Sequence, residues 1–505
     1  MALPKAEGGL RPIAVGETLR RVVGKCLLTG VKEDMRSRLE PLQVGVGTPR
    51  GAEAAVHAAR QWTERHAADP HRILVKLDLE NAFNSVDRMA VLAAVREVIP
   101  ALAPWVDFVY GVESTLWLDG RHVPSKRGFQ QGDPLGPLFF ALAQQLAIEK
   151  VVAKASQESP EQLDFAVFFL DDGTIAGTDR AVAWFVAELR QELAAIGLTL
   201  NVGKSEAIPA KGEHTAVTRA LFPEMRWNLS KSFHLLGAPI GDAAHCRAHT
   251  DERRRQGVHL MYRLADLDDP QAALLLLCHC ASYCKLAYSA RVVPPSAHQQ
   301  VLQDFDMDVR RTFEATTAMF PDDDAWGRAQ LGTAMGGLGL RSAHRHADAA
   351  YVASVVESAS LATAVDTAFD MLNGGTASCV SQAVRALNAK LPQPAHVQLS
   401  DVSGVSTAGG ITQTGASSVG CNIGLASYTP ARQGPSAARL CGGCRDGFPR
   451  ATVQEPGHVD GRRPLQSGAA ATLAHATLAR SVSLHGVRCS HGHLGGSCSL
   501  MRVQR

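Results

Sequence analysis

The fold of this chain depends on the stretch Phe168-Phe169-Leu170-Asp171-Asp172-Gly173. An apolar run that begins at Phe165 ends abruptly at two adjacent carboxylates, and a second strand-like run, residues 174–177, follows at once. Two strand-like runs joined by Asp-Asp-Gly predict a tight β-hairpin, with Asp172 and Gly173 suited to positive φ. The runs are apolar on both faces, as buried strands are. The sequence therefore places two mutually repelling carboxylates at the tip of a buried hairpin.

Adjacent carboxylates suit a hard cation, because Mg²⁺ binds one or two carboxylates and keeps positions open for phosphate oxygens. The alternative is an ordinary Asp-Gly turn on the surface, since short motifs also occur by chance. A second stretch favours the metal site: the strand-like run 72–77 ends at Asp78, and a helical pattern follows from Val86. Acids at the ends of two strands can meet at one edge of a sheet. Together, Asp78, Asp171 and Asp172 would form the acidic half of a two-metal site for phosphoryl transfer.

A third motif lies between these acids: Gly128-Phe129-Gln130-Gln131-Gly132-Asp133-Pro134-Leu135-Gly136-Pro137. With this motif the sequence resembles reverse transcriptases, whose palm motifs occur in the same order. The matching segments are residues 78–83, 128–137, 169–172, 197–205 and 233–237. The resemblance is closest to the non-LTR (LINE-type) retrotransposon enzymes.

The resemblance implies an α+β fold of the right-hand polymerase kind. It comprises a palm built on an antiparallel sheet with helices, partial fingers, a helical thumb and a disordered C-terminal tail. We expect partial fingers over residues 1–70, the palm over 71–242, a helical thumb-like region over 243–360, a helical linker over 361–400 and a low-order tail over 401–505. Small and polar residues dominate the tail, so it can bury little apolar area. Related enzymes carry more fingers upstream, and we therefore interpret the chain as a truncated copy.

By resemblance the reaction is RNA-directed DNA synthesis, in which a primer 3′-hydroxyl attacks the α-phosphate of a dNTP. The expected cofactor is a pair of Mg²⁺ (or Mn²⁺) ions, and the expected partners are an RNA template, a DNA primer and dNTPs. A bulky ring at Phe83 would exclude a 2′-hydroxyl and so select dNTPs. A lysine at position 204 would protonate the leaving pyrophosphate. The expected site residues are Asp78, Asp171, Asp172 and Lys204 for catalysis, Arg11, Phe83, Gln131 and Gly132 for the nucleotide, and Leu236 and Gly237 for the primer grip.

Three alternatives stay open at this point. A catalytically inactive retroelement remnant would only bind nucleic acid, and an RNA-dependent RNA polymerase would prefer NTPs, although Phe83 argues against the latter. The segment Gln43-Val44-Gly45 resembles the stretch that lies against the template in this family, but it could equally be a plain turn between helices.

Composition adds further expectations. The formal net charge is only +2, so any nucleic-acid surface must be local. The candidates are Arg20 and Arg21 with Lys25, the run 253–255, and Arg341 with Arg345, although a solvated helix face is the favoured interpretation of any single cluster. Eleven irregularly spaced cysteines and no secretory leader predict reduced thiols in an intracellular protein of the nucleus or cytoplasm. The chain contains no run of about 18 apolar residues, so we expect no membrane partner. Cys441 and Cys444 lack a second regular pair, so we do not predict zinc in the tail.

Overall fold

The computed structural model describes residues 2–4, 10–14, 16–118, 120–159, 161–391, 393, 396–398 and 502–504. All of them belong to one of two compact units, which comprises Met1–Thr429 together with Cys498–Arg505. The other unit, Pro430–Ser497, lies outside the described residues. The predictions of a low-order tail over 401–505 and of no zinc at Cys441 and Cys444 therefore fall outside the described part of the chain, except for one short strand.

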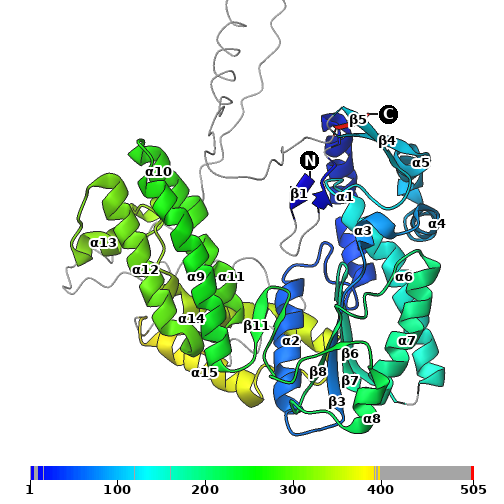
Figure 1. Cartoon of the computed structure of the whole chain (residues 1–505). Coiled ribbons are helices and arrows are strands. Elements are labelled where there is room, and N and C mark those ends of the chain that lie inside the picture. Colours follow the sequence, from blue (N-terminus) through cyan, green and yellow to red (C-terminus); the bar gives the residue numbers. More distant parts are fainter. Residues whose placement is uncertain are drawn as a thin grey trace, which may run out of the picture. The chain divides into compact units, whose positions relative to one another are not determined.

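The central sheet has five strands, of which Figure 1 labels β3, β6, β7 and β8. Its strands lie in the order β6, β7, β3, β8, β9; neighbours among the first four pair antiparallel, and β8 pairs parallel with β9. The strands are β3 (Arg72–Leu77), β6 (Leu163–Phe169), β7 (Asp172–Thr178), β8 (Glu206–Pro209) and β9 (Arg226–Trp227). The architecture of helices around a mainly antiparallel sheet, expected for a palm, is confirmed.

The sheet is buried on both faces, as its apolar strands predict. Side chains alternate along β3, so Ile73 and Val75 enter one hydrophobic cluster with α4, α6 and α7, whereas Leu74 enters another with α2. Figure 1 shows α2 on one side of the strands and α6 and α7 on the other. Each fully buried aliphatic side chain contributes about 1.5–3 kcal/mol. The helices are α2 (Gly51–Arg65), α4 (Arg88–Val98), α6 (Gly136–Glu158) and α7 (Asp179–Ala195).

Shorter elements surround this sheet. Strands β1 and β2 pair antiparallel with each other, and β4 pairs antiparallel with both β5 and β12. These elements are β1 (Ala2–Pro4), β2 (Leu10–Pro12), α1 (Thr18–Leu39), α3 (Ala82–Ser85), a 3-10 turn (Pro100–Leu102), α5 (Ala103–Tyr110), β4 (Ser114–Leu118), β5 (Arg121–Ser125), α8 (Ala216–Leu221) and β12 (Arg502–Gln504).

A hairpin of β10 and β11 leads into a helical region, and its assignment as a thumb stays a prediction. Helix α9 packs against α12, and α14 packs against α2, α11, α12 and α15. The segment predicted as a linker contains α15, which buries Val380 and Val384 in the same cluster as α2. The elements are β10 (Phe233–Leu235), β11 (Ala238–Ile240), α9 (Ala243–Ala265), α10 (Pro270–Leu276), α11 (Ala287–Val292), α12 (Pro295–Thr317), α13 (Asp323–Ala329), a 3-10 turn (Thr333–Met335), α14 (Ala343–Val365) and α15 (Gly374–Asn388).

One segment in the described part of the chain, Pro270–Val292, is long and apolar enough to cross a membrane by length and composition alone. Its backbone is interrupted between α10 and α11 by a π-helical turn, Leu277–Ala281, and a 3-10 turn, Tyr283–Lys285. Leu277 and Ala290 are fully buried in the helical region. Of its most apolar window, 33% is buried inside the structure. The absence of a membrane partner stays a prediction.

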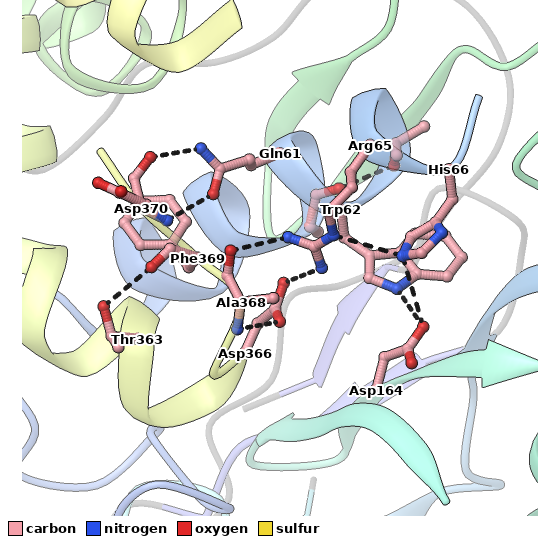
Figure 2. Close-up of polar contacts among 12 residues, drawn as sticks. Gln61, Trp62, Arg65, His66, Asp164, Thr363, Asp366, Ala368, Phe369 and Asp370 are labelled. Atoms are coloured by element: carbon pink, nitrogen blue, oxygen red, sulfur yellow. Dashed lines mark hydrogen bonds and ion pairs between the residues drawn. The ribbon is translucent and has the colours of Figure 1, made fainter. Parts of the chain in front are cut away.

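Helix α2 connects the sheet with the segment that follows α14 (Figure 2). Gln61 binds both backbone groups of Asp370: its Nε2 donates to the carbonyl oxygen (2.7 Å), and its Oε1 accepts from the amide N–H (2.8 Å). On the next residue, the Trp62 Nε1–H donates to Asp164 Oδ2 at the start of β6 (2.8 Å). Helix α2 therefore binds both the sheet, at Asp164, and the segment that follows α14, at Asp370.

Asp306 on α12 caps the first turn of α14. Its Oδ1 accepts from the Ala343 N–H (2.7 Å), and its Oδ2 accepts from the His344 N–H (3.2 Å) and the Ser342 hydroxyl. Burial raises the pKa of Asp306 to about 6, although these three hydrogen bonds act in the opposite direction. The folded state therefore holds the proton of this carboxyl more tightly than the unfolded chain does.

This difference in pKa predicts a pH dependence of stability. The contribution of Asp306 is fully present below its unfolded pKa and is lost as the pH rises through about 6. An Asp306→Asn variant cannot ionise at this position. Between about pH 4 and pH 8, the wild type should therefore lose about 1–2 kcal/mol more unfolding free energy than the variant does. Thermal unfolding at both pH values measures this. Asp304→Asn on the same helix is the control; parallel pH profiles for wild type and Asp306→Asn would contradict the assignment.

Candidate active site

The predicted hairpin is present, but its turn lies earlier than predicted. Phe169 pairs with Asp172, so Leu170 and Asp171 form the turn, and Leu170 carries the positive φ (57°). Asp172 and Gly173 instead begin β7. Gly173 is required there for space, because a Cβ would lie 2.7 Å from the ring of Phe168, its partner across the strands. The prediction that Asp172 and Gly173 adopt positive φ was therefore wrong.

The register between β3 and β7 brings the third acid to this tip. Leu77 pairs with Gly173, so one step further along the same register Asp78 lies opposite Asp172. The backbone of Asp78 is held on its other side: its N–H donates to Ser205 Oγ (3.2 Å), and its carbonyl accepts from the Asn201 N–H (2.8 Å). Asp78 and Asp172, which are far apart in the sequence, thus meet at one edge of the sheet.

The electrostatics of this edge are those of crowded carboxylates. Displacement of water, followed by the charges of Asp171 and then Asp78, raises the pKa of Asp172 to about 6. Lys76 acts in the opposite direction but is also paired with Glu206 (3.0 Å). Asp172 is itself exposed, so solvent screens part of the repulsion. The arrangement favours a cation at this edge.

The side chains at this edge have the chemistry that magnesium prefers. In the described part of the chain, no group of three or more His, Cys, Asp or Glu side chains is arranged to hold a metal ion on its own. Mg²⁺ usually takes only one or two protein carboxylates and completes its shell with water and phosphate oxygens. The all-carboxylate donor set at Asp78, Asp171 and Asp172 fits such a site, which a phosphate-bearing substrate would complete.

Phe83 is fixed by the loop of the third motif. The Phe129 N–H donates to Phe83 O (2.7 Å), and the Phe83 ring stacks on Phe140 of α6 with centroids 4.6 Å apart. Gly128 has φ +62°, and a Cβ there would lie 2.3 Å from Phe83 O. Only glycine allows this approach without a shift of the backbone. The ring is half-buried, and its role as a sugar gate stays a prediction.

Gln131 and Gly132 contact the N-terminal segment. The Ala14 N–H donates to Gln131 O (3.0 Å), and Gly132 has φ +123° with Ala14 O only 2.6 Å from where a Cβ would stand. This packing brings β2, which contains Arg11, towards the motif loop; the side chain of Arg11 is outside the described part. Nucleotide contacts by Arg11, Gln131 and Gly132 stay predictions.

A polar cluster that the sequence did not predict lies beneath this loop. Asp133 Oδ2 accepts from Arg20 Nη2 (2.7 Å) and from the Tyr110 hydroxyl (2.7 Å). The guanidinium groups of Arg20 and Arg88 lie over the Tyr110 ring at 5.1 and 5.2 Å from its centroid. Burial and the charge of Asp133 raise the pKa of Tyr110. Arg20, considered above as nucleic-acid surface, is thus paired inside the protein. Asp133 stood in the quoted motif, but nothing in the sequence indicated its partners.

The remaining predicted residues lie on two other turns. Lys204 is exposed and directly precedes Ser205, whose hydroxyl contacts Asp78. Leu236 and Gly237 form the two-residue turn between β10 and β11, with φ values of 48° and 78°. Positive φ at both positions is typical of a type I′ turn. The Tyr288 hydroxyl donates to Leu236 O (3.1 Å). Proton donation by Lys204 and primer binding by the turn stay predictions.

Comparisons with known proteins show which family and which proteins this chain is similar to. Residues 3–240 match the family model described as reverse transcriptase (RNA-dependent DNA polymerase). The chain is 26% identical over 236 residues to the retrotransposable element SLACS 132 kDa protein of Trypanosoma brucei gambiense. It is 25% identical over 213 residues to the retrovirus-related Pol polyprotein from the type-2 retrotransposable element R2DM of Drosophila melanogaster. These alignments cover 45% and 40% of this chain, but only 19% and 20% of the relatives, so the chain spans about a fifth of their length.

Among solved structures, a similar chain is telomerase from Candida tropicalis in complex with a TWJ fragment of telomeric RNA. It is 10% identical, the match covers 73% of this chain and 57% of that chain, and the TM-score is 0.37. This is a distant similarity.

The crowding of carboxylates predicts a stability effect that depends on divalent ions. Without them, Asp172→Asn should raise the melting temperature by about 1–2 °C, because it removes one of three repelling charges. Added Mg²⁺ should stabilise the wild type more than the variant and so reduce the difference between their melting temperatures. Thermal unfolding with EDTA or with Mg²⁺ measures this, with exposed Asp268→Asn as the control. Equal Mg²⁺ shifts in wild type and Asp172→Asn would contradict a cation site at this edge.

Proposed function

We propose that this chain extends a DNA primer on an RNA template, using dNTPs as substrates, because residues 3–240 match the reverse transcriptase family model and are similar to two retrotransposon proteins. The observation that carries the proposal is the β3–β7 register, which brings Asp78 opposite Asp172 beside the turn that contains Asp171. Three carboxylates at one sheet edge supply oxygen ligands of the kind that bind Mg²⁺ in phosphoryl transfer with two metal ions.

In this proposal Asp78, Asp171 and Asp172 hold two Mg²⁺ (or Mn²⁺) ions, which supply charge neutralisation and orientation of oxygens when bound. The carboxylates need a rigid backbone for this, and the hydrogen bonds of Asp78 to Ser205 and Asn201 support one of them. Lys204, next to Ser205, donates the proton that the leaving pyrophosphate requires.

The nucleotide and primer residues complete the proposal. Phe83 excludes the 2′-hydroxyl of an incoming nucleotide, and its stacking on Phe140 supports this role because a supported ring cannot move away. Arg11 contacts the triphosphate, and Gln131 and Gly132 contact the nucleotide or template. Leu236 and Gly237 hold the primer end at the tip of the β10–β11 hairpin.

We also propose an intracellular location, in the nucleus or cytoplasm. Six cysteines in the described part of the chain are free thiols, and free thiols are typical of a reducing compartment.

The first test is primer extension on an RNA template with dNTPs and Mg²⁺. Asp171→Asn should lower the rate by about 10³-fold or more while leaving the melting temperature nearly unchanged, because it removes a metal ligand and keeps a side chain of the same size in a half-buried turn. Asp268→Asn, an exposed carboxylate of the helical region, should keep wild-type activity. A folded wild-type chain that binds primer-template but does not extend it would refute the proposal and favour a remnant that only binds nucleic acid.

The second test concerns the sugar. Phe83→Ala should reduce the preference for dNTP over NTP, measured as the ratio of kcat/KM values, by about 10²-fold, because it opens space for a 2′-hydroxyl. Phe83→Tyr keeps the ring and is the matched control. An unchanged ratio in Phe83→Ala would contradict the role of Phe83 in excluding the 2′-hydroxyl. A wild type that prefers NTPs would favour an RNA polymerase instead.

A further inference from the structure

The turn that carries Asp171 has an unfavourable backbone. Its first residue, Leu170, lies in the left-handed region at φ +57°. Residues other than glycine seldom adopt this conformation, and where they do the surrounding structure must hold them there. Because Asp171 follows directly, any relaxation of Leu170 would redirect its carboxylate. The structure must therefore contain a group that fixes this turn.

Gln43 is that group. The Leu170 N–H donates to Gln43 Oε1 (2.8 Å), and Gln43 Nε2 donates to the Leu170 carbonyl (3.1 Å). One carboxamide thus binds both backbone groups of the strained residue. These two contacts join positions 127 residues apart in the sequence.

The carboxamide of Gln43 is itself immobilised. Its side chain is fully buried, its Nε2 also donates to Gln144 Oε1 on α6 (2.8 Å), and its Oε1 also accepts from the Gly45 N–H (3.0 Å). Both donors and the oxygen are therefore used. The opposite orientation would point the NH₂ group at two backbone N–H groups, so the hydrogen-bond network permits only this one.

The backbone around Gln43 is registered to the same turn. The Phe168 N–H donates to Leu42 O (2.6 Å), and the Val44 N–H donates to Phe168 O (2.8 Å), which pairs this loop with the end of β6. At Gly45 a Cβ would lie 2.6 Å from the Leu170 nitrogen, so the loop approaches as closely as glycine allows. The loop is thus neither a plain turn between helices nor, at Gln43, a surface that could reach a template.

We propose that Gln43 is a positioning residue of the active site, which holds Leu170 in its left-handed conformation and thereby aims the Asp171 carboxylate at the metal ions. This inference rests on the proposed function for its catalytic consequence. The glutamine contacts no reacting atom; it acts only through the backbone of the turn.

Gln61 offers a matched control. It binds both backbone groups of Asp370 in the same manner, at 2.7 and 2.8 Å, and is also buried, but it lies on the face of α2 towards the α14–α15 segment (Figure 2). Gln43→Met and Gln61→Met therefore remove the same kind of contact from a buried site. The site of Gln43 lies next to the acids, and the site of Gln61 lies away from them. Comparing them separates loss of positioning from general loss of stability.

The test uses the full chain in the primer-extension assay and in Mn²⁺ binding followed by electron paramagnetic resonance. Gln43→Met should lower kcat by about 10–100-fold and weaken Mn²⁺ binding, because the carboxylate is misplaced. Gln61→Met should change neither by more than about twofold. Leu170→Gly added to Gln43→Met should restore about 5- to 30-fold of the lost kcat, since glycine adopts positive φ without the carboxamide.

The proposal would be overturned if Gln43→Met had the same kcat and Mn²⁺ affinity as Gln61→Met. It would also be overturned if adding Leu170→Gly to Gln43→Met restored none of the lost kcat. If Gln43→Met does not fold, Gln43→Asn takes its place, because a carboxamide withdrawn by one methylene cannot reach both groups of Leu170. If the wild type itself does not extend primers, the proposed function fails, and the difference in Mn²⁺ affinity between the variants at Gln43 and Gln61 still decides the positioning role.

Discussion

Mutual repulsion among Asp78, Asp171 and Asp172 is the constraint on which the rest of the structure depends. The β3–β7 register sets two of these acids opposite each other, and the tight turn after β6 adds the third. Carboxylates stay together only where the backbone beneath them cannot yield and a cation offsets their charge. The sheet meets the first condition by burying both of its faces, with Ile73 in one hydrophobic cluster and Leu74 in the other.

The motif residues that do not carry charge serve this edge through close packing. Gly128 admits the Phe83 carbonyl, Gly132 admits the Ala14 carbonyl, and Gly173 makes room for the Phe168 ring. In each case a Cβ would stand within 2.7 Å of another atom. The glycines therefore draw the loop of the third motif, the N-terminal segment and the hairpin into contact, which is a structural function distinct from any contact with a nucleotide.

Two networks of buried polar groups then fix the loops relative to the sheet. Gln43 holds the turn at Leu170, and Asp133 joins Arg20 with Tyr110 beneath the third motif. Buried polar groups of this kind are expensive to leave unsatisfied, so each network specifies one arrangement of its loop. The helical region is connected to the same core, because α2 packs against the sheet on one side and against α14 on the other.

The sequence by itself determined the strands, their burial on both faces and the position of Asp78 and Asp171 at strand ends, because period-two and apolar patterns are local properties of the chain. The hairpin turn lies earlier than the sequence predicts. Leu170, rather than Asp172 or Gly173, takes positive φ, because hydrogen bonds from a distant side chain hold it in that conformation. Only the tertiary structure decided that Gln43 hydrogen-bonds to Leu170, 127 residues away, and that Arg20 pairs with Asp133, 113 residues away. A hydrogen bond between distant side chains leaves no periodic mark in a sequence, and its geometry exists only once the chain has folded.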